Sequence, residues 1–579
     1  GNVNGTLNYR HAGDEDFLTG ELGARAFDGP LLAHFDVGGE GVVLDGRALA
    51  RGLLAWADLP ALESLVTGYF PYTARLDLEG SAPRLALESD LEGLAIHLPA
   101  PFGKEIGERV PLRVEATPGE LVHVNVAQRL RMRWRSRDAE TGQGQVWLQQ
   151  WPSSPDWPAG PGWELAWQAP QLSIERWQEA LAGLSLPRVA AGEDRESLSP
   201  PLLRRVRIET DCLQWEGRCL GSMQAGIVPL AEGWRATLDG SLVQGLAEYR
   251  PQQPTPLAIT LSQLQLDPLL PEASGSAQAT DPARAGESVS LLDQVATAPE
   301  PVALPAWLGK IPAGQLKVEA LGYAGRTLGP LTAGWNASAQ RLEVAPLSLA
   351  VGEIVAEGEL AWERSGAEAS LTRSRLALTG GDLGSLIEAL GQPVPLRSES
   401  TRVQTQLAWP GAPWQFALER SRGSIEARLE DGRFLTLESP SARLVGLLNV
   451  DNLLRRLRLD FSDVTGQGTA FDSVTGSATL YDGRLETRGP VEIDGASTHF
   501  SLDGSVNLVA KQLDLLLGVT VPVSQNLPLA AVLVGAPYVG GALYLADKVF
   551  GGWIDKVTQI YYRVQGPWTS PQITLENAE

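Results

Sequence analysis

Hydrophobic and polar positions alternate with a period of two along most of this chain. Between residues 129 and 137, Leu130, Met132 and Trp134 alternate with five arginines. Successive side chains of a strand point to opposite faces of a sheet, so this segment predicts a strand with one apolar and one cationic face. The same alternation recurs along the chain, for example at Leu76 and Leu78, at Leu342 and Val344, and around Leu407.

Acidic-residue–glycine pairs separate many of these alternating runs. Such a pair favours a tight hairpin, because glycine adopts positive φ without strain. The pattern therefore predicts a long series of antiparallel strands, on the order of 30 at normal strand spacing along a chain of this length. The pairs are Glu79-Gly80, Glu216-Gly217, Asp239-Gly240, Asp431-Gly432, Asp482-Gly483 and Asp503-Gly504.

Two loop-like stretches interrupt the series, at residues 184–201 and 268–305. The second is rich in Pro, Ala, Ser and acidic residues and is the better candidate for a boundary. We therefore divide the chain into a repetitive β segment, residues 1–305, and a C-terminal region, residues 306–579. The alternative is a disordered loop inside one continuous sheet.

Helices are predicted to be few and short. Residues 58–67, 173–184 and 382–390 each begin with a good N-cap, namely Asp58, Ser173 and Asp382. A longer helix is predicted over residues 441–457, where leucines recur at helical spacing.

Residues 515–546 form a long stretch without a charged side chain. Pro522, Pro528, Pro537 and Gly540 interrupt it, which argues against a straight helix that spans a membrane. We predict a strand followed by a helical tip over about residues 527–558. The tip either contacts a lipid surface or caps a core as a buried helical hairpin. Its predicted membrane-contact residues are Leu529, Val532, Leu533, Val539, Leu543, Leu545, Phe550 and Trp553.

Composition narrows the class of function. The net charge of −22 over 579 residues would repel a phosphate backbone, so no nucleic-acid partner is expected. The 2 cysteines, Cys212 and Cys219, could face each other in a hairpin, and a disulfide there would need an oxidising compartment. The chain begins with Gly1 and shows no signal peptide, and we expect a fragment or a processed chain.

No catalytic or metal-binding motif emerges from the sequence. The 5 histidines make no HExxH pair or other short metal spacing, and no GxSxG elbow or P-loop is present. Asp460 and Asp463 could pair as acid and base, but carboxylates at this spacing more often serve turns and caps. We expect no enzyme activity, no cofactor and no metal.

A long sheet with one apolar face must hide that face. It can close as a barrel, pack on a second sheet, or curl into an open trough. A trough becomes reasonable when it holds acyl chains, since each buried methylene contributes about 0.8 kcal/mol. We predict a hydrophobic groove lined by Leu76, Leu78, Leu130, Met132, Trp134, Leu342, Val344, Leu407 and Leu418, with the arginines between residues 129 and 137 facing outward.

Three blocks in the second half resemble the AsmA-like superfamily, and within it the large YhdP-type family of Gram-negative bacteria. They are RLVGLLNVDNLLRRLRLDFSDVTGQGTAFDSVTGSATLYDGRLET (residues 443–487), NLPLAAVLVGAPYVGGALYLADKVF (residues 526–550) and YRVQGPWTSPQITLE (residues 562–576). Before Tyr323 the resemblance is looser.

The resemblance implies an elongated, curled sheet with a taco-like hydrophobic groove. It also implies a periplasmic, inner-membrane-anchored bridge that carries phospholipid towards the outer membrane, with its C-terminal end on that side. The N-terminal transmembrane helix of the family is absent from this chain, which fits a C-terminal portion. The alternative function is a structural or assembly factor for envelope proteins, as in TamB-like members, where strand edges template other strands.

Overall fold

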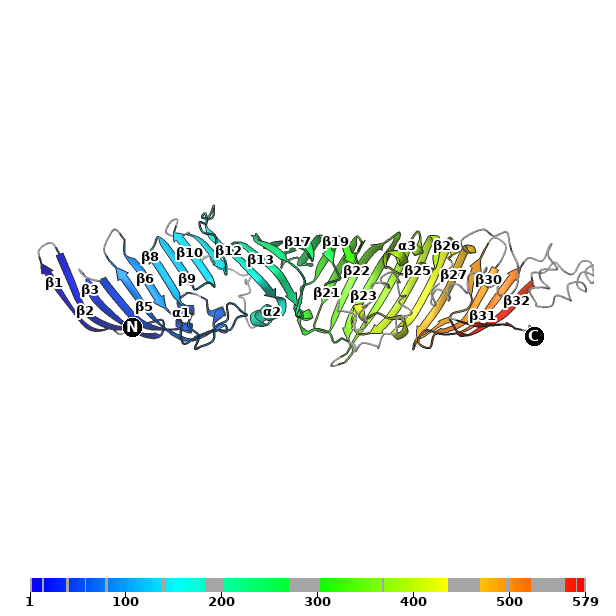
Figure 1. The fold of residues 1–579 in the computed structure, drawn as a ribbon, viewed down its shortest axis with the longest axis horizontal. Helices are drawn as coiled ribbons and strands as arrows, with labels where there is room; N and C mark the ends of the chain where they lie inside the picture. The colour runs from blue at the N-terminus through cyan, green and yellow to red at the C-terminus, as the bar shows by residue number, and fades with distance from the viewer. Residues whose placement is uncertain are drawn as a thin grey trace, which may run out of the picture. The chain divides into compact units, whose positions relative to one another are not determined.

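The computed structural model describes residues 3–12, 15–37, 41–57, 59–78, 82–136, 142–182, 203–269, 302–366, 369–435, 469–495, 499–521, 558–568 and 570–576. These residues are mainly β, with 33 strands and a few short helices. They fall into two compact units, Gly1–Pro251 and Gln252–Glu579. Figure 1 draws unit 1 from blue to green and unit 2 from green to red.

Unit 1 is a curled sheet of consecutive strands with two short helices, α1 (Ala50–Trp56) and α2 (Ile174–Ala182). The strands are β1 (Asn4–Ala12), β2 (Glu15–Ala26), β3 (Gly29–Val37), β4 (Gly41–Leu49), β5 (Val66–Asp77), β6 (Arg84–Ser89), β7 (Leu94–Ile96), β8 (Leu112–Thr117), β9 (Leu121–Val126), β10 (Leu130–Ser136), β11 (Gly142–Leu148), β12 (Gly162–Ser173), β13 (Leu203–Trp215), β14 (Arg218–Cys219), β15 (Met223–Leu230), β16 (Gly233–Gly240) and β17 (Val243–Tyr249).

Unit 2 repeats this plan with one α-helix, α3 (Leu383–Ala389), and three short 3₁₀ turns, η3 (Ala306–Lys310), η4 (Pro413–Gln415) and η5 (Leu418–Arg420). The strands are β18 (Leu257–Gln265), β19 (Gly314–Tyr323), β20 (Arg326–Leu328), β21 (Leu331–Ala337), β22 (Arg341–Val351), β23 (Ile354–Arg364), β24 (Ser370–Gly380), β25 (Leu396–Pro410), β26 (Arg422–Phe434), β27 (Thr469–Tyr481), β28 (Arg484–Thr487), β29 (Val491–Asp494), β30 (His499–Asn507), β31 (Gln512–Val521), β32 (Thr558–Pro567) and β33 (Gln572–Glu576).

Most strands pair antiparallel with the strand before them, so the predicted fold class is confirmed. Three pairs depart from the prediction and are parallel: β11 with β12, β12 with β13, and β18 with β19. Parallel neighbours need a connection that returns the chain to the starting end of the sheet, and this takes a dozen or more residues. The stretches predicted as loops, residues 184–201 and 268–305, lie inside two of these connections. The division at residues 305 and 306 stays a prediction.

Each unit has its own hydrophobic core. In unit 2 the core follows the last strands, where Phe434, Phe471 and Trp568 are buried, and Lys511 lies over the Trp568 ring at 5.7 Å. In unit 1 the main core packs α1 and residues 91–110 against β5. Lys104 is buried there, and its Nζ donates to the carbonyl of Leu94 at 2.8 Å. Desolvation by burial lowers the pKa of Lys104.

The helix predictions were partly right. The prediction over residues 58–67 is largely wrong: the segment holds a single 3₁₀ turn, η1 (Pro60–Leu62), the helix α1 lies before it, and Val66 already begins β5. Val66 and Thr67 pair with β7, and these ladder bonds outweigh the local helix signal. The helices predicted after Ser173 and Asp382 are confirmed as α2 and α3, while residues 441–457 lie outside the described residues.

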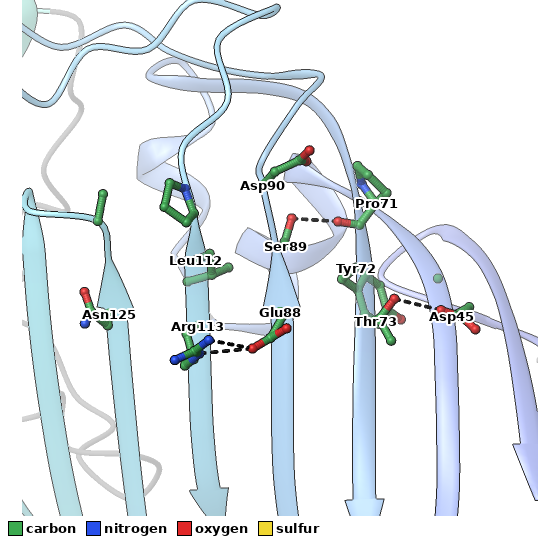
Figure 2. A pocket seen from close by; sticks show the side chains of 13 residues that line it. Asp45, Pro71, Tyr72, Thr73, Glu88, Ser89, Asp90, Leu112, Arg113 and Asn125 are labelled. Carbon is green, nitrogen blue, oxygen red and sulfur yellow. Dashed lines mark hydrogen bonds and ion pairs between the residues drawn. The ribbon is translucent and has the colours of Figure 1, made fainter.

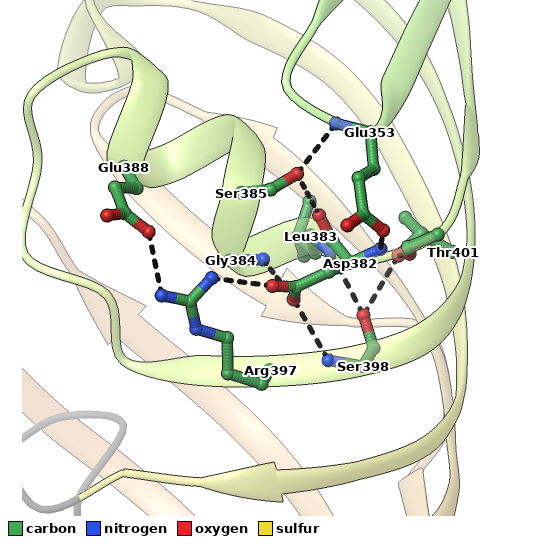
Figure 3. Close-up of polar contacts among 10 residues, drawn as sticks. Glu353, Asp382, Leu383, Gly384, Ser385, Glu388, Arg397, Ser398 and Thr401 are labelled. Carbon is green, nitrogen blue, oxygen red and sulfur yellow. Dashed lines mark hydrogen bonds and ion pairs between the residues drawn. The ribbon is translucent and has the colours of Figure 1, made fainter.

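A polar network fixes α3 to its neighbouring strands (Figure 3). Asp382 caps the helix by accepting from the Gly384 N–H at 2.7 Å, and it also accepts from the Ser398 N–H at 3.1 Å. Arg397 donates to Asp382 at 2.6 Å and to Glu388 at 2.7 Å. Burial would raise the pKa of Asp382, but the hydrogen bonds from Arg397, Ser398 and Gly384 outweigh it and hold that pKa below its usual value.

Turns form at only some of the acidic-residue–glycine pairs that predicted them. Glu216-Gly217 and Asp482-Gly483 connect strands, with positive φ at both residues of each pair. Asp431-Gly432 and Asp503-Gly504 instead lie inside β26 and β30, and these two hairpin predictions are wrong. Both strands continue because each is hydrogen-bonded to neighbouring strands on both sides, although Asp431 itself has positive φ and is left out of both registers.

Cys212 and Cys219 form a disulfide between β13 and β14. Their Cα atoms lie 5.5 Å apart, and Gln214 and Cys219 face each other across the strand pair. The pairing that the hairpin pattern left open is therefore present. No helix among the described residues combines the length and the apolar character needed to cross a membrane.

Candidate functional site

One face of the sheet in unit 1 is apolar from its first strand to its last. The strand register places residues side by side in rows that cross the sheet, and the row through Met132 contains no polar member. Proceeding from β1 to β17, this row is Gly5, Leu22, Ala33, Leu44, Ala74, Leu87, Val114, Val124, Met132, Val146, Leu165, Val206, Ile227, Ala236 and Ala247.

The predicted groove residues of unit 1 share this apolar face. Leu76 and Trp134 stand in one row, connected through Leu85, Ala116 and Val122. Leu130, Met132 and Trp134 follow one another at alternate positions of β10. All four predicted residues in strands, Leu76 included, are half-buried, so the chain does not fully cover the apolar face of unit 1 at these positions. Leu78 lies just beyond the end of β5 and is 46% exposed.

The opposite face of unit 1 is polar. A row on this face runs through Asp45, Thr73, Glu88, Arg113, Asn125 and Arg131. Figure 2 shows side chains that line a cavity on this face. The volume of the cavity is about 780 Å³. Thr73 donates to Asp45 at 2.7 Å, and Arg113 pairs with Glu88 at 2.8 Å. The polar groups of this cavity largely satisfy one another.

Unit 2 carries the same arrangement. The row through Val344 and Leu407 contains one polar member, Ser374. It is Leu257, Gly314, Trp335, Val344, Leu360, Ser374, Leu407, Gly423, Leu480, Leu485, Val506, Leu513 and Gly566.

The predicted groove residues of unit 2 differ in burial. Leu342 and Val344 are half-buried on the apolar face. Leu407 is on the same face but only 8% exposed, inside the core. Leu418 belongs to η5, outside the strand ladder, and packs against that core. The structure therefore brings three of these residues onto one face, and Leu418 supports that face from a turn.

Short helices and turns pack on the apolar faces at intervals. In unit 1 the ring of Trp177 in α2 lies 5.0 Å from that of Trp167, and Phe102 lies 5.5 Å from Trp167. In unit 2, Leu308 of η3 packs in one cluster with Trp362. The aromatic cluster of unit 1 is not among the sequence predictions, because its members come from segments far apart in the chain. The alternation in β12, which puts Trp163, Leu165 and Trp167 on one face, was the available signal.

The arginines of β10 lie on the face opposite to Met132, as predicted, but they are not all freely exposed. Arg131 is exposed, whereas Arg133 and Arg135 are half-buried. The connection between β11 and β12 covers them, and Arg133 donates to the carbonyls of Pro155 and Asp156 at 2.7 and 2.8 Å. Arg137 lies outside the described residues.

A further cluster of titratable side chains joins β29 and β30. His499 lies between Asp494 and Glu492, with its ring nitrogens 2.7 Å from each carboxylate. The hydrogen bond from His499 lowers the pKa of Asp494, followed in effect by the one from Ser473. Within the ranges that the structure describes, no group of three or more His, Cys, Asp or Glu side chains could hold a metal ion.

The predicted tip, about residues 527–558, lies almost entirely outside the described residues, and so do its eight predicted contact residues. The start of the charge-free stretch is described: residues 515–521 belong to β31, which confirms the predicted strand there. The membrane-contact assignment stays a prediction.

Comparisons with known proteins agree with the resemblance seen in the sequence. A family model described as "YhdP protein" matches residues 2–573, and so extends the likeness to the first half of the chain. The "Intermembrane phospholipid transporter YhdP" of Escherichia coli (strain K12) is 25% identical over 506 residues. That alignment covers 85% of this chain but 37% of the relative, so the chain spans well under half of that protein's length. No solved structure matches this chain.

Proposed function

This chain belongs to the YhdP family, and on that premise we propose that it carries phospholipid along a hydrophobic groove, as part of a bridge between the inner and outer membranes of a Gram-negative envelope. In each unit the proposed groove is the apolar face of that unit's own sheet. The cargo follows from the relative that is named an intermembrane phospholipid transporter. The role is transport without catalysis.

The observation that supports this proposal is the unbroken apolar row through Met132. A face of this kind that stayed in contact with water would be unfavourable at about 25 cal/mol for each Å² of apolar surface. Acyl chains can cover it, and each methylene removed from water contributes about 0.8 kcal/mol. The half-buried state of Leu76, Leu130 and Met132 leaves apolar surface available for such contacts.

The charges of the chain support the same arrangement. Arg113 and Glu88 form an ion pair on the face opposite to the apolar row. A lipid tail on the apolar face therefore meets no charged group of that row, while the polar face remains compatible with the aqueous periplasm.

Photo-crosslinking at neighbouring positions tests the groove. Leu76 and Arg75 are adjacent in β5 but lie on opposite faces, and Leu342 and Glu343 form the same kind of pair in β22. A photoreactive amino acid at Leu76 or Leu342 should capture phospholipid in cells, identified by mass spectrometry, and one at Arg75 or Glu343 should not. Equal capture at both members of each pair would contradict the groove.

We further propose that the predicted tip is where lipid leaves the groove for the outer membrane. The two prolines Pro528 and Pro537 favour short helices that lie in an interface without spanning it. Deleting residues 528–553 should leave the sheet folded, by circular dichroism, and abolish flotation with liposomes. If the deletion variant unfolds and the intact chain does not float, the segment is a plug of the core and not an exit.

A further inference from the structure

The polar face of unit 1 holds a second cavity, of about 260 Å³, next to the cationic strand β10. Two rows of side chains cross it from β8 through β9 to β10. One row is Arg113, Asn125 and Arg131, and the other is Glu115, His123 and Arg133. Figure 2 shows Arg113 and Asn125 projecting from neighbouring strands on this face. Residues directly opposite each other across strands lie close enough for their side chains to meet on one ligand.

Three arginines stand at alternate positions of β10, namely Arg131, Arg133 and Arg135. Within the described part of the chain, no carboxylate lies within ion-pair distance of Arg131, Arg133 or Arg135. Several arginines elsewhere do have a carboxylate partner, as Arg375 has Glu359 at 2.9 Å and Arg235 has Glu248 at 2.6 Å.

Three like charges at alternate positions of one strand repel one another, since alternate residues are about 7 Å apart. Aromatic rings offset part of this repulsion. The guanidinium of Arg133 lies 4.0 Å from the Trp157 ring, and that of Arg135 lies 4.5 Å from the same ring. Desolvation by burial, followed by the charge of Arg135, lowers the pKa of Arg133, while the carboxylate of Asp156 acts in the opposite direction.

The two arginines that β10 contributes to the cavity have different roles. Arg133 is held in place by Gln145, whose Oε1 it contacts at 2.6 and 2.8 Å, and by the carbonyls of the β11–β12 connection. Arg131 lies 5.5 Å from the Trp151 ring, and its side chain donates no hydrogen bond to another described residue. Arg131 is thus oriented by stacking and keeps its N–H groups available.

We propose that this cavity binds a phosphate group, with Arg131 as the principal ligand and His123 and Asn125 as additional donors. A planar guanidinium donates two parallel hydrogen bonds to phosphate oxygens, and this geometry favours arginine at such sites. Glu115 stands beside His123 and opposes the bound anion. The site lies on the face opposite to the apolar row, so it does not depend on the proposed transport of acyl chains.

Paired variants test this site in the whole chain by titration calorimetry with inorganic phosphate and glycerol phosphate. Arg131→Gln should weaken binding at least tenfold, and Glu115→Gln should strengthen it about threefold, because one removes the main donor and the other removes the repelling charge. Arg235→Gln, which makes the same charge change in unit 1 away from the cavity, should leave the affinity unchanged. Equal weakening by Arg131→Gln and Arg235→Gln would overturn the proposal, since only net charge would then matter.

Vesicles distinguish the two sources of such a phosphate group. Flotation is compared between phosphatidylglycerol and phosphatidylcholine vesicles, for the intact chain and for Arg131→Gln. Binding of soluble phosphate that depends on Arg131 identifies a free phosphate ester as ligand. Binding only to vesicles, again lost in Arg131→Gln, identifies a lipid headgroup. If neither soluble phosphate nor either vesicle binds in a manner that depends on Arg131, the site does not exist.

Discussion

The substitution Met132→Glu places a carboxylate in the middle of the unbroken apolar row of unit 1. Its strand neighbours in that row are Val124 and Val146, and no cation of the row can neutralise it. Met132 is half-buried and lies outside the main core of the unit, so the carboxylate can remain hydrated while the sheet stays folded. The perturbation therefore falls on the ligand and not on the fold.

The size of the effect follows from the acyl chain that passes Met132. A hydrated carboxylate prevents the methylenes beside it from packing on the face. If three methylenes lose contact, the loss is about 2.4 kcal/mol at 0.8 kcal/mol each. Since 1.4 kcal/mol is a factor of ten, the occupancy of this stretch by lipid should fall about 50-fold.

Native mass spectrometry of the purified chain, after loading with phospholipid, measures the occupancy. The matched control is Ala86→Glu, which adds the same charge at an exposed position on the opposite face of β6. Thermal unfolding of both variants checks that the sheet is intact. Met132→Glu should bind much less phospholipid than Ala86→Glu at equal stability. If the two variants bind equal amounts of lipid, the row through Met132 does not contact acyl chains and the reasoning fails.

Three further predictions concern stability. Asp382→Asn should lower the free energy of unfolding of unit 2 by about 2 kcal/mol at neutral pH. The folded-state pKa of Asp382 is held below its usual value of 3.8, so this stabilisation is present above pH 3.8 and is lost as the pH falls through the folded-state pKa. Urea unfolding from pH 7 to pH 3 should therefore show the stabilities of wild type and variant converging. Replacing Cys212 and Cys219 by serine opens a loop of sequence separation 7 and should destabilise unit 1 by about 2 kcal/mol, with wild type under reducing conditions matching the variant in urea unfolding. Trp568→Ala should cost unit 2 about 3–5 kcal/mol, since the side chain is 1% exposed, whereas truncation of the exposed Trp414 should change the midpoint of unfolding little.

The choice of position matters for any test of the groove. Leu407 is among the residues that the sequence assigns to the lining, yet it is buried in the core of unit 2. A charge there would unfold the core before it affected a ligand. Alternation along a strand tells which face a residue shares, but it does not tell how deeply the rest of the chain covers that residue.

The period of two determined much of this protein by itself. A strand turns each successive side chain to the other face, so the alternation in residues 129–137 already separated Met132 from Arg131. The capping signals of Ser173 and Asp382 were also sufficient to predict the helices α2 and α3, because a cap acts within one turn of its own helix. These features depend on neighbours in sequence, and for that reason the sequence alone predicts them.

Only the tertiary structure decided the features that depend on residues distant in the chain. Pairing of β26 and β30 with the strands that flank them overrode the turn signals of Asp431-Gly432 and Asp503-Gly504. The parallel pairs β11–β12, β12–β13 and β18–β19 depend on where long connections bring the chain back. The same is true of the covered arginine Arg133, whose partners come from a connection more than twenty residues away. The register of a strand, and the burial of its residues by other segments, depend on the pairing of whole strands. No local sequence pattern reports that pairing.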